Sequence, residues 1–141
     1  KISIDRIDLL EDGSYLIVDY KSSLQNISDW FGSLPRKPQL PLYAAFLPNS
    51  DGIGFAEVKK DNCRINGLIK DVQGGVINLD PNTRRNMSKD MNWNSQIEIW
   101  KETILNLLKD FINGQKEIEL TSGSCKNCVF DSICRINSSG G

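Results

Sequence analysis

The feature that most constrains the fold is a pair of apolar segments, residues 1–10 and 14–22, joined by the residues EDGS. An Asp-Gly step between two such segments is a strong signal for a β-hairpin. With a loop of three residues, 11–13, Leu10 pairs with Ser14, and opposite residues have numbers that sum to 24. The second segment carries apolar residues at both odd and even positions, which predicts a central strand covered on both faces.

This register places charged side chains where a core is expected. Asp5 lies opposite Asp19, with their Cβ atoms about 5 Å apart, and Lys21 shares the face of Asp19. Two facing carboxylates require either a raised pKa on one of them or a divalent cation between them. A lysine beside such a cation can orient an attacking water and offset charge that develops on a phosphate. The alternative is a surface hairpin whose charges are solvated.

Composition excludes several classes of function. The 141 residues include 17 basic and 18 acidic side chains, so a surface that binds nucleic acid must be local. The sequence has no histidine, which excludes Ser/His/Asp triads, Cys/His dyads and zinc held by histidine. We find no secretory signal and no apolar run of about 18 residues, so we expect a cytoplasmic protein with no membrane partner. The strand pattern at residue 1 predicts that the chain is the C-terminal part of a longer protein.

The remaining patterns predict further helices and strands. PQLPLYAAFL, residues 38–47, predicts a short helix with its prolines confined to the first turn. Two strands are expected at 52–60 and 63–69, and loops at 23–37 and 70–92. A second helix begins at the capping-box pattern SQIE, residues 95–98, and ends at Gly114. Its apolar stripe predicts ordinary core packing by Ile97, Trp100, Ile104, Leu107, Leu108 and Phe111.

Three of the four cysteines lie close together, as Cys125, Cys128 and Cys134. Their spacing fits a partial metal site, but zinc or an iron–sulfur cluster normally takes four ligands. Cys63 is a candidate for the fourth, although a buried, inert cysteine is the prediction we favour at that position. The sequence therefore suggests a core domain over residues 1–121 and a cysteine-rich tail over 122–141.

The series IDRID…DG…IVDYKSS, followed by PQLPLYA, resembles the PD-(D/E)XK nuclease superfamily, in particular its RecB-like, AddB-type branch. The resemblance implies an α/β, restriction-endonuclease-like core, in which helices flank a central mixed sheet. It also implies a deoxyribonuclease that depends on Mg²⁺ or Mn²⁺, held by Asp5, Asp19 and the backbone carbonyl of Tyr20. The implied catalytic residues are Asp5, Asp19, Lys21, Gln39 and Tyr43.

The tail CKNCVFDSIC is similar to the tails of iron–sulfur members of that branch. This implies that Cys125, Cys128 and Cys134 bind a [4Fe–4S] cluster, with a fourth ligand upstream of residue 1; zinc is the alternative. The resemblance further implies work in DNA repair or recombination beside a helicase-like region or subunit. Two departures from the family pattern, Ile2-Ser3 before the first motif and the missing upstream ligand, suggest a metal site that is incomplete in this fragment.

A nuclease also needs cationic contacts to phosphates. The candidate DNA-binding residues are Arg36, Lys37, Arg84 and Arg85, and Trp30 and Phe31 are candidates for stacking on bases. Two other hypotheses remain open. One is a catalytically inactive member of the same fold that binds DNA or acts as a scaffold, and the other is a zinc-binding interaction module.

Overall fold

The structure is a computed structural model of the 141-residue chain, and it describes residues 3–60, 62–80 and 91–114. The chain divides into two compact units, Lys1–Lys109 and Asp110–Gly141. The first unit contains the sheet and the helices up to Lys109. No helix in the described ranges has the length and apolar character that crossing a membrane requires.

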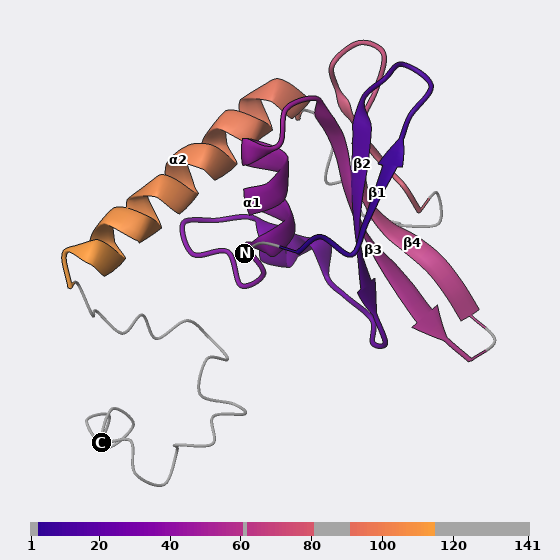
Figure 1. Ribbon diagram of the computed structural model, residues 1–141, viewed down its shortest axis with the longest axis horizontal. Helices are drawn as coiled ribbons and strands as arrows, with labels where there is room; N and C mark the ends of the chain where they lie inside the picture. The colour runs from indigo at the N-terminus through magenta and orange to yellow at the C-terminus, as the bar shows by residue number, and fades with distance from the viewer. Residues whose placement is uncertain (1–2, 61, 81–90, 115–141) are drawn as a thin grey trace, which may run out of the picture. The chain divides into compact units, whose positions relative to one another are not determined.

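The first unit is built on a five-stranded mixed sheet with the strand order β1-β2-β3-β4-β5. Its strands are β1 (Arg6–Leu9), β2 (Tyr15–Lys21), β3 (Ser50–Lys59), β4 (Asn62–Lys70) and β5 (Val76–Asn78). Only β2 and β3 run parallel, because helix α1 (Gln39–Phe46) connects them. Helix α1 and helix α2 (Trp93–Ile112) lie on the same side of the sheet (Figure 1). The predicted α/β fold with a central mixed sheet is confirmed.

The register of the first hairpin is the predicted one. Leu10 donates to the Ser14 carbonyl across the three-residue loop, and Gly13 adopts a φ of +83° that favours glycine. The paired residues run from Arg6↔Val18 to Leu9↔Tyr15, so their numbers sum to 24. The middle of β2, Leu16–Asp19, is buried on both faces, as the apolar residues at odd and even positions predict.

The main core lies between the sheet and the helices, and it contains three tryptophans, Trp30, Trp93 and Trp100. Trp30 is fully buried, with its ring centroid 5.0 Å from that of Phe55. Its carbonyl accepts a hydrogen bond from Trp100 Nε1. Trp30 is therefore excluded as a candidate for stacking on bases, because its large apolar surface fills the core instead.

Helix α2 differs from the prediction in where it begins and in how much of its apolar stripe is buried. It begins at Trp93, and the side chain of Asn92 accepts from the Ser95 N–H at 3.1 Å. Asn92, rather than Ser95, is thus the N-cap. Trp100 and Ile104 are buried as expected, but Leu108 remains 48% exposed, so only part of the stripe forms core in the first unit.

Two further predictions need correction. The expected loop over 70–92 contains β5, whose three residues pair with the end of β4. Asp71 Oδ1 accepts from the N–H groups of Gln73 and Gly75, which closes the turn that brings β5 back. Cys63 is exposed rather than buried, because it lies near the tip of the β3–β4 hairpin.

Some predicted site residues lie outside the described residues: Arg84, Arg85, Cys125, Cys128 and Cys134.

Candidate active site

The carboxyl end of β2 brings Asp19 and Lys21 together on the face that carries the helices. Side chains alternate along a strand, so these two residues share the face of Ile17, which lies in the core. The side chain of Asp19 is 7% exposed, and Lys21 Nζ lies 2.6 Å from its Oδ2. That oxygen has an ionic partner but receives no hydrogen bond of acceptable geometry from the described residues.

Asp5 lies directly before β1, at the same end of the hairpin. One further step of the β1–β2 register places it opposite Asp19, as the sequence predicts. Its Oδ2 accepts a hydrogen bond from the Tyr20 N–H at 3.1 Å, and its side chain is exposed. The two carboxylates and Lys21 therefore gather at the open end of the β1–β2 ladder.

Helix α1 carries Gln39 and Tyr43, and Tyr43 contacts the segment that leads into β1. The two residues are four apart, so they share one face of the helix, and Gln39 Nε2 donates to the Tyr43 hydroxyl at 3.2 Å. The hydroxyl in turn donates to the Ser3 carbonyl at 3.1 Å. Tyr43 thus fixes the backbone two residues before Asp5, which is a positioning contact rather than contact with a reacting atom.

A pocket of about 320 Å³ opens beside Lys21. It brings predicted catalytic and predicted DNA-binding residues into one place. Its lining is formed by Lys21, Arg36, Lys37, Pro38, Gln39, Leu40 and Phe55. The side chains that can make ionic contacts in this pocket are all basic, which suits a phosphate group.

Glu57 is a buried charge near this pocket that the sequence did not single out. It is opposite Lys21 in the parallel β2–β3 pair and is 1% exposed. It accepts from the Gln25 N–H at 2.6 Å and from Arg64 Nε at 2.7 Å. Burial acts to raise its pKa, but these hydrogen bonds and the charge of Arg64 outweigh burial and lower it. Glu57 follows Ile53 and Phe55 at every second position of β3, so it shares their inward face. This alternation is the only sequence signal that could have revealed its position.

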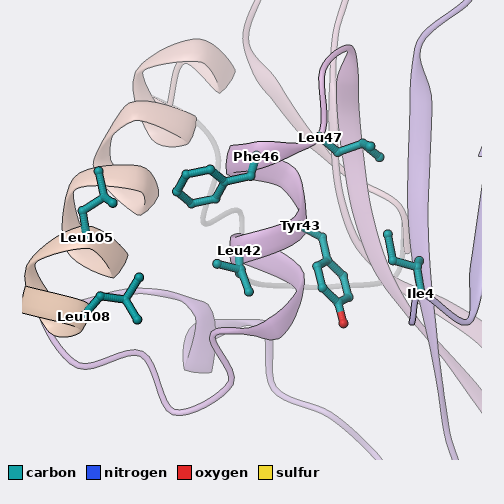
Figure 2. Close-up of a pocket in the computed structure, with 7 residues that line it drawn as sticks. All are labelled: Ile4, Leu42, Tyr43, Phe46, Leu47, Leu105 and Leu108. Atoms are coloured by element: carbon teal, nitrogen blue, oxygen red, sulfur yellow. The ribbon is translucent and has the colours of Figure 1, made fainter. Parts of the chain in front are cut away.

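An apolar groove of about 510 Å³ lies between α1 and α2 (Figure 2). It is lined by Ile4, Leu42, Tyr43, Phe46, Leu47, Leu105 and Leu108. The lining includes neither Asp5, Asp19 nor Lys21, and it offers almost no polar surface. The groove therefore lacks the groups that hydrolytic chemistry requires.

The donor set at the end of the hairpin can be tested for its fit to a metal ion. Within residues 3–60, 62–80 and 91–114, no three His, Cys, Asp or Glu side chains form a group that could hold one. Mg²⁺, however, usually takes only one or two carboxylates and keeps several waters. Asp5 and Asp19 supply two, and Asp19 Oδ2, whose partner is the Lys21 ammonium, keeps a second lone pair to offer. These residues fit a hard divalent cation.

Comparison with known protein families identifies the superfamily of the chain. The sequence model of the PD-(D/E)XK nuclease superfamily matches residues 3–135. No curated protein matches the chain. A solved structure titled "Crystal structure of SSO0001" shares 14% sequence identity at a TM-score of 0.38, over 93% of this chain and 48% of that one. The chain thus spans about half the length of that protein, and the likeness is too distant to inform fold or function.

Proposed function

Because the chain belongs to the PD-(D/E)XK nuclease superfamily, whose members are generally metal-dependent nucleases, we propose that it hydrolyses phosphodiester bonds in DNA. The observation that carries this proposal is the hairpin register, which brings Asp5, Asp19 and Lys21 to one end of the sheet. Asp5, Asp19 and the Tyr20 carbonyl would hold Mg²⁺ or Mn²⁺. When bound, the cation would stabilise negative charge on the phosphate as a Lewis acid.

The side chains of the site account for the rest of the chemistry. In the reaction a water oxygen bonds to phosphorus and the bond to the leaving sugar oxygen breaks, and the proton that the water loses is balanced by the proton that the leaving oxygen takes up. The Lys21 ammonium can donate to the attacking water or to a phosphate oxygen, because it is held at the strand end by Asp19. Tyr43 and Gln39 keep the Asp5 segment in place through the Ser3 carbonyl.

The first experiment is a cleavage assay with labelled single- and double-stranded DNA in Mg²⁺ or Mn²⁺. We expect Lys21→Ala to reduce the rate by about 10²–10⁴-fold, the range for loss of a group that assists proton transfer or charge stabilisation. A chelator should abolish cleavage. Lys101→Ala, which removes an exposed cation on α2, is the matched control and should cleave like wild type. Cleavage by Lys21→Ala at the wild-type rate would contradict the assigned site.

A second experiment tests the metal site without requiring activity. Asp5→Asn keeps an oxygen that can accept from the Tyr20 N–H but removes the charge that would bind a cation. We expect Mn²⁺ to raise the melting temperature of the wild-type chain and to raise that of Asp5→Asn much less, because a ligand that binds only the folded state stabilises it. Glu98→Gln, an exposed carboxylate on α2, should respond like wild type. An equal response of Asp5→Asn would exclude Asp5 as a ligand.

An inactive member of the superfamily that binds DNA or acts as a scaffold is the second candidate. The observation in its favour is that, among the described residues, no group of three or more His, Cys, Asp or Glu side chains could hold a metal ion. Stabilisation by Mn²⁺ together with DNA binding, but without cleavage in any of the assays, would support it.

The finer assignments rest on the resemblance of the sequence motifs. We propose the RecB-like, AddB-type branch, a role in DNA repair or recombination, and a helicase-like partner. We also propose a tail over residues 122–141 in which Cys125, Cys128 and Cys134 bind a [4Fe–4S] cluster or zinc. Their spacing supports the proposal. Iron, acid-labile sulfide and zinc measured on anaerobically purified protein would distinguish a cluster, zinc and an empty tail.

A further inference from the structure

The segment between β2 and α1 is fastened to the sheet at Gln25. Its N–H donates to the Glu57 carboxylate at 2.6 Å, and its carbonyl accepts from Asn66 Nδ2 at 3.0 Å. Glu57 and Asn66 are both buried, and they lie on neighbouring strands, β3 and β4. The sheet thus fixes both backbone polar groups of Gln25 through side chains.

The side chain of Gln25 has one orientation in this arrangement. Its Nε2 donates to the Ser23 carbonyl at 2.9 Å, which directs Oε1 the other way, where it accepts from Lys37 Nζ at 2.7 Å. Lys37 Nζ also lies 3.1 Å from Asp29 Oδ2 and 5.8 Å from the centroid of the Phe55 ring. The ammonium is therefore held from several directions.

Lys37 nevertheless retains capacity for a ligand. An ammonium group has three N–H donors, and Gln25 and Asp29 use two of them. Its side chain is 37% exposed and lines the pocket beside Lys21. Each of the two lysines is paired with one carboxylate, and Arg36 also lines the pocket.

We propose that this pocket is a phosphate subsite, in which Gln25 and Asp29 aim the Lys37 ammonium at a backbone phosphate of the DNA strand next to the phosphate that is cut. Gln25 is a positioning residue, and Glu57 and Asn66 hold it. The inference rests on the proposed function, because it takes DNA as the substrate. A lysine that is already held in place loses less conformational freedom when it binds a phosphate, which favours binding.

The test measures binding of the 141-residue chain to a fluorescent single-stranded DNA oligonucleotide, by anisotropy, with a chelator present. We expect Lys37→Ala to weaken binding about 5-fold and to reduce the slope of log K against log salt by about 0.7, the value for one phosphate contact on a single strand. Gln25→Met, which keeps the side-chain length but removes the acceptor, should weaken binding about 3-fold with a smaller loss of slope. The double variant should bind like Lys37→Ala, because Gln25 acts through Lys37.

Two controls separate this mechanism from a general effect of charge or folding. Lys101→Ala should keep the wild-type slope, and Gln25→Met should keep the wild-type melting temperature to within a few degrees. The inference is overturned if the wild-type chain does not bind, if Gln25→Met binds like wild type, or if Lys101→Ala loses as much slope as Lys37→Ala. It also fails if Gln25→Met weakens DNA binding by the same factor in the wild-type chain and in the Lys37→Ala variant. No cleavage is measured, so failure of the subsite and failure of the nuclease are distinguishable.

Discussion

Tyr43 illustrates how single residues of the site act through the backbone. Its ring packs against the core, while its hydroxyl receives a hydrogen bond from Gln39 and donates to the Ser3 carbonyl. The motif predicts a role for Tyr43 near the reaction, and the hydrogen bonds of its hydroxyl suggest that this role is one of positioning. The hydroxyl fixes the chain two residues before Asp5, so the position of a carboxylate depends on a residue in α1.

Tyr43→Phe should therefore lower the cleavage rate about 10-fold, since displacing a catalytic group slightly has large effects on rate. It should cost only about 0.5–1.5 kcal/mol of stability, the usual net value of one hydrogen bond. Cleavage kinetics and urea unfolding measure the two effects. Tyr15→Phe removes a hydroxyl for which the described residues show no hydrogen bond, and it is the control. Equal effects of the two variants on rate would exclude the positioning role.

At the scale of elements, the β2–α1–β3 unit determines where the candidate active-site residues lie. β2 and β3 are parallel, so Lys21 and Glu57 lie at carboxyl ends that face the same way. Ligands of α/β proteins commonly bind at that edge of the sheet. On the other side of β3, Gly54 pairs with Gly67 of β4, which holds these two strands close together.

Gly67→Ala should destabilise the fold by about 1–3 kcal/mol, the range for overpacking. A Cβ at this position would collide with the Ile53 carbonyl and the Gly54 Cα, and backbone atoms cannot yield easily. Gly54→Ala is the matched control, because its Cβ would lie 3.1 Å from side-chain methyl groups of Ile65 and Leu79, and the nearest backbone atom, the Asn66 carbonyl oxygen, is at an ordinary contact distance of 3.7 Å. Urea midpoints compare the two, and a larger loss for Gly54→Ala would contradict this explanation.

For the whole molecule, the buried Glu57 makes the free energy of unfolding depend on pH. Its folded-state pKa is lowered, so the folded chain binds fewer protons than the unfolded chain in the acid range. The stabilisation by Glu57 is fully present above the unfolded pKa of about 4.3. It is lost as the pH falls through the folded pKa.

Glu57→Gln should consequently lower stability at pH 7 by about 1–3 kcal/mol, because it leaves Arg64 without its buried partner. It should also flatten the decline of stability below about pH 4, where the wild-type carboxylate takes up its proton. Chemical unfolding measured across this pH range gives both quantities. A wild-type pH dependence in Glu57→Gln would show that other carboxylates control acid stability.

The sequence by itself determined the β1–β2 hairpin and helix α1, which carry the motif residues. Side chains alternate along a strand and the Asp12-Gly13 turn fixes the register, so Asp5 could be placed opposite Asp19 from local rules alone. Helix α1 followed from equally local signals. The restriction-endonuclease-like fold followed from the order of the motifs, in agreement with the family match.

Only the tertiary structure decided what lies between these elements. Burial of Trp30, the fastening of Gln25 by Glu57 and the convergence of Lys37 on the pocket of Lys21 all join residues that lie far apart in the chain. Periodicity reports whether a side chain is apolar or which face it takes, but it does not report its partner. Those partners follow from how the loop before α1 folds back on the sheet, and the proposed phosphate subsite depends on them.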